Sequence, residues 1–431
     1  MWILTSGYAR GMADPLKNQE YEVTSRSIGQ SRALLLIAAA EVLTLSVWFS
    51  ASVVSSPLQR LWHLTPIEVA LLTASVQLGF VVGAVAASLT ALADRFDARR
   101  VLALSALLAA GVNALFTVSS SWEMGMVLRM LTGLAMVGVY PVAVKLVAEW
   151  SPRHRGSAVG ILVGALTVGS ALPHLILFFG ISAPWQSVVL ASSALALLGA
   201  GIVTFFLPAH PQQRASKSGK ISLASLRAVV TNKAVMLTNY GYFGHMWELY
   251  AMWTWFPTFV YASFVLSGHR QGGAALAALS SFLIIGIAGA AGSVLGGRLA
   301  DRFGRTVITS VAMGTSGLCA LVVGFTFGGP IWIVLLVGTI WGIAVVADSA
   351  QFSAAVTELS AVENVGTALT MQTAVGFVIT ILSINLVAAA RDVLGWHWVF
   401  VLLSAGPFLG VYSMLRLRAH ASSFAMAGGQ R

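Results

Sequence analysis

The sequence has 431 residues, of which 57% are hydrophobic and 9% are charged, and it carries a formal net charge of +10. Its mean hydropathy of +0.84 excludes a soluble globular domain and indicates a protein that crosses a membrane several times. The positive charge does not indicate nucleic-acid binding, because most lysines and arginines fall in the polar connections between apolar segments.

Apolar segments long enough to cross a hydrocarbon layer of about 30 Å follow one another along the chain. They cover residues 33–54, 67–92, 101–118, 122–148, 157–181 and 185–207 in the first half, and 234–261, 274–297, 307–327, 330–355, 366–389 and 397–415 in the second. We therefore predict an all-α membrane protein with twelve transmembrane helices. Its parts are a tail at 1–32, a bundle at 33–207, a polar linker at 208–233, a bundle at 234–415 and a tail at 416–431.

The distribution of basic residues predicts the orientation. With the N-terminus inside, only Arg60, Arg270 and Arg391 fall in outer connections. This positive-inside bias predicts a multi-pass protein of the cytoplasmic membrane with both termini in the cytoplasm. The first 32 residues lack a basic region followed by an apolar run and a cleavage site, so we expect no signal peptide.

The two halves of the sequence repeat each other. Glu41 stands seven residues before Trp48, and Glu248 stands seven residues before Trp255, at an offset of 207 positions. The same offset relates two charged runs, Asp94-Arg95-Phe96 and Asp301-Arg302-Phe303. A period this long suits two parallel six-helix bundles with a substrate site between them.

Three short motifs resemble those of a known family. The run Gly297–Arg305 resembles the loop motif of the major facilitator superfamily, and Leu92–Arg100 is a second copy in which Asp97-Ala98 replaces the turn glycine. Arg129 with Gly133 is similar to the family's fourth-helix motif. The resemblance implies two pseudo-symmetric six-helix bundles.

The same resemblance implies a cytoplasmic gate in which the loop acids contact the opposite bundle. Its residues would be Asp94, Arg95, Asp301, Arg302 and Arg305. Asp301 would face the start of the fifth span, and Asp94 the start of the eleventh. The alternative is that these loops only fix the topology.

Two carboxylates lie inside apolar spans, where a charge is expensive and usually functional. On a helix, Trp48 lies about 20° from the face of Glu41 and roughly 10 Å along it, and Trp255 stands in the same relation to Glu248. We predict that both glutamates couple protons and that Arg129 is the counter-charge of Glu41. The alternative is that each glutamate hydrogen-bonds a neighbouring helix and packs its bundle.

The predicted substrate path contains Trp48, His245, Trp255 and Asp348. His245 precedes Glu248 by three residues and shares its helix face, which provides a second titratable group. Trp253, near the end of the same span, could equally well belong to a belt of aromatic residues at the membrane interface. A carboxylate beside an aromatic wall favours an organic cation or an amphipathic aromatic solute.

These features predict a proton-coupled secondary transporter of a small organic solute that works by alternating access. The expected partners are the solute, protons and the lipid bilayer, and the protein is expected to be a monomer.

Cys319 is the single cysteine, which excludes an intrachain disulfide and cysteine-based metal or redox motifs. The sequence contains no Walker loop, metal-ligand spacing or nucleophile motif, so we expect neither an enzyme nor a cofactor. The alternatives are a transporter-like receptor that binds ligand without turnover and, less favoured, a membrane enzyme.

Overall fold

The computed structural model describes residues 15–90, 95–150, 155–208, 222–269 and 272–430, and this part of the chain is helical with no strand. The helices of the first half are α1 (Pro15–Leu45), α2 (Ser50–Val53), α3 (Ser55–Trp62), α4 (Pro66–Thr90), α6 (Ala98–Leu115), α7 (Trp122–Met136), α8 (Tyr140–Trp150), α9 (Arg155–Phe179) and α10 (Trp185–Gly201). Those of the second half are α11 (Leu223–Thr231), α12 (Lys233–Leu266), α13 (Gly273–Ser281), α14 (Gly289–Phe303), α15 (Arg305–Val322), α16 (Ile331–Ala347), α17 (Ser349–Leu359), α18 (Val365–Trp398) and α19 (Val401–Arg418).

Within the described ranges, ten helical segments are long and apolar enough to cross a membrane. Several of them join two of these helices, such as α7 with α8 and α16 with α17. α1 and α19 occupy the positions of the predicted first and twelfth spans. α1 packs against α9 and α10, and α19 packs against α12 and α15, so both belong to the bundles. The predicted all-α membrane fold is confirmed.

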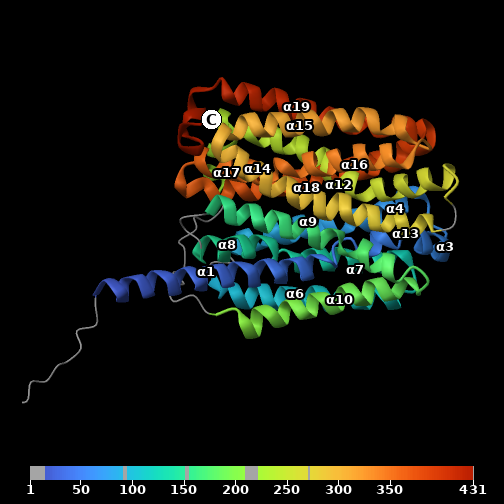
Figure 1. The fold of residues 1–431 in the computed structure, drawn as a ribbon, viewed down its shortest axis with the longest axis horizontal. Coiled ribbons are helices and arrows are strands. Elements are labelled where there is room, and N and C mark those ends of the chain that lie inside the picture. Colours follow the sequence, from blue (N-terminus) through green and yellow to red (C-terminus); the bar gives the residue numbers. More distant parts are fainter. Residues whose placement is uncertain (1–14, 91–94, 151–154, 209–221, 270–271, 431) are drawn as a thin grey trace, which may run out of the picture.

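The two halves of the chain lie side by side, the first in blue to green and the second in yellow to red (Figure 1). They meet where α9 packs along α14 and where α18 packs along α4. Ser293 Oγ donates to the carbonyl of Gly160 at 3.1 Å, and the hydroxyls of Ser88 and Thr370 are 2.8 Å apart. These contacts join the halves and surround the space between them.

The first span is not one helix as predicted. α1 ends at Leu45, the chain turns through residues 46–49, and the short helix α2 follows. Its repeat counterpart, α12, continues without interruption from Lys233 to Leu266. The fourth and tenth spans are interrupted at matching places, because Pro141 and Asp348 are 207 positions apart and each lies beside a junction between two helices.

Two glycines allow α4 and α7 to approach each other closely. A Cβ atom on Gly79 would lie 1.8 Å from the carbonyl oxygen of Met130, and one on Gly133 would lie 1.9 Å from that of Val76. Neither backbone oxygen can move without displacing its helix. This approach brings Arg129, on α7, against the interrupted first span.

We predict that Gly133→Ala lowers the unfolding free energy by about 1 to 3 kcal/mol, because the added methyl group forces α4 and α7 apart. The matched control is Gly111→Ala on α6, where no atom lies within 4 Å of the added Cβ. That change should be neutral or stabilise by roughly 0.5 to 1 kcal/mol through helix propensity. Thermal unfolding in detergent measures both variants, and equal melting temperatures would contradict the close approach.

Candidate functional site

A cavity of about 250 Å³ lies between the two halves, and we call it the central cavity. Helices of both halves contribute to its wall, including α4, α8 and α9 from the first half and α12, α17 and α18 from the second. Its lining is mostly apolar and aromatic, and no aspartate or glutamate of the described ranges lines it. Its prominent aromatic residues are Trp48, Phe80, Tyr140, Tyr242, Tyr250, Trp253 and Phe377.

A histidine and an aspartate form the titratable pair of the central cavity. His245 lines the cavity from α12, and its Nδ1 atom lies 2.9 Å from Oδ1 of Asp348. Its Nε2 atom lies 3.0 Å from the hydroxyl of Ser349. Asp348 stands at the junction between α16 and α17 and is buried behind the histidine. The two predicted substrate-path residues therefore act as one unit, with His245 facing the cavity.

The two repeat-related glutamates lie in different environments. Both are fully buried, and neither lines the central cavity. Glu248 accepts hydrogen bonds of 2.7 Å from the hydroxyl of Ser316 and from Nε1 of Trp341, which links α12 to α15 and α16. Among the described residues, neither carboxylate oxygen of Glu41 has a hydrogen-bond partner. Glu248 thus stabilises packing within its own half, whereas the charge of Glu41 has no local compensation.

Arg129 holds the interruption of the first span. Its guanidinium donates to the carbonyl of Val47 at 3.1 Å and to the carbonyl of Trp48, both in the turn that follows α1. It also donates to Oδ1 of Asn113 at 2.8 Å and to the hydroxyl of Ser50 at 3.3 Å. Arginine is suited to this role because its fork of donors reaches several acceptors at once.

The predicted pairing of Arg129 with Glu41 is wrong. Unpaired carbonyls inside a membrane cost several kcal/mol each, and the arginine satisfies them instead. The sequence prediction missed Asn113, which accepts from Arg129 and donates to the carbonyl of Val189 at 3.0 Å. An amide within an otherwise apolar third span was the available signal.

The tryptophans of the repeat also differ. Trp48 lines the central cavity, as placed by the turn after α1. Trp255 lines neither this cavity nor the second one described below, so its place on the substrate path stays a prediction. Its Nε1 donates to the carbonyl of Ile384 at 3.0 Å, and the guanidinium of Arg391 lies 5.5 Å from its ring. Trp253 is not part of an exposed belt, because it is only 2% exposed and lines the cavity.

A second cavity of about 370 Å³ lies towards the α3 end of the bundles. Trp253 lines both cavities and forms part of the wall between them. Its ring centroid is 5.9 Å from that of Phe49 and 5.3 Å from that of Tyr250, so the partition joins the first half to the second. Arg60 and His174 line the second cavity, and no acidic residue in the described part of the chain does.

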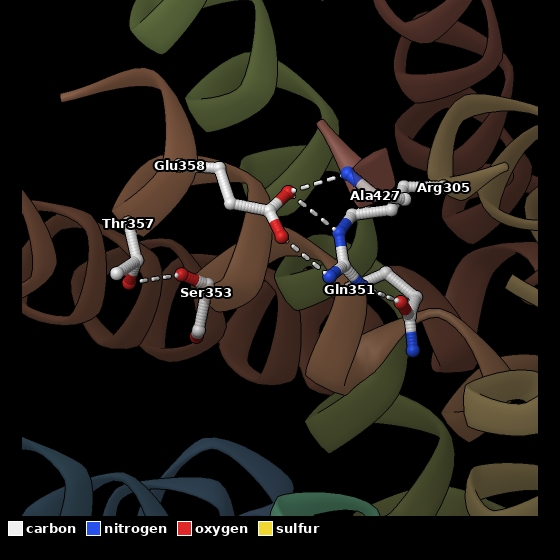
Figure 2. A network of polar contacts seen from close by, with 6 residues as sticks. All are labelled: Arg305, Gln351, Ser353, Thr357, Glu358 and Ala427. Atoms are coloured by element: carbon white, nitrogen blue, oxygen red, sulfur yellow. Dashed lines mark hydrogen bonds and ion pairs between the residues drawn. The ribbon is translucent and has the colours of Figure 1, made fainter. Parts of the chain in front are cut away.

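The predicted gate residues are only partly brought together. Figure 2 shows Arg305 at the centre of a polar network, where it donates to both carboxylate oxygens of Glu358 at 2.7 and 2.8 Å and to Oε1 of Gln351 at 2.7 Å. The backbone N–H of Ala427 also donates to Glu358, at 3.2 Å. Arg305 thus binds within its own half, and Glu358 is a partner that the sequence prediction missed.

The other gate residues that the structure describes, Arg95, Asp301 and Arg302, form no hydrogen bond or ion pair with described residues of the opposite half. Asp301 and Arg302 are exposed, and Asp301 has no hydrogen bond or ion pair within the described ranges. The guanidinium of Arg302 lies 5.2 Å from the ring of Phe303. Arg95 is exposed, and Asp94 lies outside the described residues. The gate therefore stays a prediction.

Comparisons with known proteins agree with this architecture. The family model described as Major Facilitator Superfamily matches residues 36–348. The chain is 26% identical over 247 residues to the 3-(3-hydroxy-phenyl)propionate transporter of Escherichia coli strain K12, covering 57% of this chain and 58% of that protein. It is 26% identical over 257 residues to a probable sulfoacetate transporter, SauU, of Cupriavidus necator, covering 56% and 58%. The chain thus spans about three fifths of the length of these curated relatives.

A solved structure is similar over nearly the whole chain. It is a bacterial homologue of the human lysosomal transporter Spinster, in an inward-facing and unoccupied conformation. The TM-score is 0.66 at 15% sequence identity, and the match covers 93% of this chain and 97% of the other. This likeness concerns the fold.

We predict that Arg129→Leu lowers the unfolding free energy by about 3 kcal/mol or more, because it removes charge-assisted hydrogen bonds and leaves buried carbonyls unpaired. Glu41→Gln should have a much smaller effect, since that carboxylate loses no hydrogen bond. Thermal unfolding of the two single variants and the double variant should show additive losses. A double variant that is more stable than Arg129→Leu alone would show that Arg129 and Glu41 do interact, and would contradict the assignment made from the structure.

Proposed function

Because this chain belongs to the major facilitator superfamily, we propose that it is a secondary transporter of a small organic solute that works by alternating access and is coupled to protons. The observation that carries the proposal is the central cavity between the two halves, with the His245–Asp348 pair at its wall. Buried titratable groups beside a cavity at a bundle interface are typical of transport pathways. The moving bodies would be the bundles at 33–207 and 234–415.

We propose that the solute is a small organic acid. The curated relatives carry names that refer to 3-(3-hydroxy-phenyl)propionate and sulfoacetate, and both compounds bear anionic oxygen groups. The sequence left an organic cation and an amphipathic aromatic solute open, and the cavity supports an acid over the cation, because no carboxylate of the described residues, Glu248 included, lines it. Its aromatic walls suit an apolar body on the solute.

The proton would reside on two sites, Glu41 and the His245–Asp348 pair. Glu41 is buried without a hydrogen-bond donor, so binding a proton removes an uncompensated charge. His245 faces the cavity and can take a proton beside Asp348. Glu248 remains a third candidate, although its two donors already stabilise a charged carboxylate. Arg129 would contribute indirectly by fixing the turn that carries Trp48.

We further propose that the protein works as a monomer in the cytoplasmic membrane with both termini in the cytoplasm. The end of the bundles near α17 would then be cytoplasmic, and the loops with Asp94, Arg95, Asp301, Arg302 and Arg305 would form the gate there. A receptor that binds a solute without moving it is the alternative. It predicts binding without exchange across a membrane.

We predict that the reconstituted protein exchanges a labelled organic acid in counterflow and concentrates it under a pH gradient. Glu41→Gln and His245→Asn should each abolish concentration, because each removes a proton site. Glu41→Gln should still support counterflow, which requires no net proton movement. Glu363→Gln, on an exposed turn outside the cavity, is the control and should behave as the wild type.

Two outcomes contradict this proposal. If both variants concentrate the labelled acid under a pH gradient as the wild type does, Glu41 and His245 do not couple protons to transport. Saturable binding of an acid by the wild type with no counterflow would favour the receptor.

A further inference from the structure

Two tryptophans of the central cavity have indole N–H groups without a partner. Trp48 is 4% exposed and Trp253 is 2% exposed, and both line the cavity. Nε1 of each has no hydrogen-bond partner within the described ranges. A buried N–H that finds no acceptor is costly, and native proteins rarely keep one without a functional reason.

Three other tryptophans of the second half show that this chain normally satisfies such groups. Nε1 of Trp247 donates to the carbonyl of Leu402, and Nε1 of Trp255 donates to that of Ile384, each at 3.0 Å. Nε1 of Trp341 donates to Glu248 at 2.7 Å. None of these three lines the central cavity. Of these five tryptophans, the two with unpaired indoles are the two that line the central cavity.

The two unpaired indoles come from opposite halves of the protein. Trp48 stands in the turn after α1, where Arg129 binds its carbonyl oxygen. Trp253 stands on α12, the repeat counterpart of that span. The ring of Tyr250 joins them, with centroids 6.1 Å from Trp48 and 5.3 Å from Trp253. Both N–H groups therefore belong to one aromatic cluster that crosses the interface.

The chemistry of the surrounding wall selects the kind of group that binds here. An indole N–H is a donor only, so its hydrogen-bond partner must be an acceptor, and an ammonium group cannot be that partner. Among the described residues, no carboxylate lines either cavity, whereas Arg60 and His174 line the second cavity, which Trp253 also borders. An anion approaching from that side meets positive or neutral groups throughout.

We propose that Nε1 of Trp48 and Nε1 of Trp253 together bind the carboxylate of the transported acid, so that the bound acid joins the two halves. The apolar body of the acid would extend along α12 towards His245, which stands eight residues before Trp253 and so about 12 Å along the helix. This site rests on the proposed function for its substrate class.

The test compares acids with their amides on the purified full-length chain. The probes are benzoate, phenylacetate and nicotinate, each paired with its carboxamide, and the binding constants come from thermal shifts. At least one acid should bind more tightly than its amide. Trp48→Phe and Trp253→Phe keep an aromatic ring but remove the N–H, and each should weaken binding of that acid by about tenfold or more. Trp247→Phe is the matched control and should leave binding unchanged.

A measurement on the wild type keeps the test independent of how the variants fold. With ¹⁵N-labelled indoles, two of the 13 tryptophan N–H resonances should move downfield on adding the acid, as expected for new hydrogen bonds. The proposal is overturned if no acid binds more tightly than its amide, if both phenylalanine variants bind it as the wild type does, or if no indole resonance shifts.

Counterflow of the same acid separates this site from the proposed function. If the wild type exchanges the acid and the Trp48→Phe and Trp253→Phe variants exchange it equally well, the protein is a transporter but the indoles do not form the binding site. Binding that depends on both indoles, without exchange by the wild type, would leave the site standing and refute transport.

Discussion

The arrangement of the site depends on one constraint, which is that backbone carbonyls inside a membrane must find donors. The first span breaks at residues 46–49, and Arg129 supplies donors to the carbonyls of Val47 and Trp48. Asn113 holds the same guanidinium and is itself held by the carbonyl of Val189. With the backbone satisfied in this way, the turn can direct Trp48 and Phe49 towards the other half. The polar network around Arg129 therefore holds the turn that supplies the first half's aromatic residues to the partition.

The repeat explains the fold, whereas the departures from the repeat explain the site. Glu41 and Glu248 occupy equivalent positions, yet only Glu248 receives hydrogen bonds from neighbouring helices. α12 runs on where the first span breaks, so Trp255 packs against α18 and Trp48 reaches the cavity. Alternating access needs two similar bodies, but recognition of one solute requires different groups on each. In this chain the shared helices form two similar bodies, and the turn at 46–49 makes the two halves differ at the central cavity.

The sequence predicted features that depend on local composition and on the repeat. Long apolar runs identified the helices, and the 207-residue offset identified the two halves, because membrane insertion is governed by hydropathy within each segment. The break at 46–49 was missed because no proline or glycine marks it. The acceptors of Arg129 are backbone carbonyls, which every residue has, so residue types alone pointed to Glu41 instead. Trp255 does not line the cavity because the helix face that it shares with Glu248 packs within the second half, and spacing along the helix does not reveal which way that face points.

The segment after α19 forms short turns at Ala421–Ala425 and Ala427–Gly429, with Ser423 and Met426 fully buried. Met426 packs with Met313, Phe352 and Met414, and the neighbouring Ala427 donates to Glu358, the partner of Arg305 (Figure 2). The last residues of the chain are thus joined to the framework of the second bundle. Removing residues 421–430 would therefore uncover the apolar cluster around Met426 and take one hydrogen-bond donor away from Glu358.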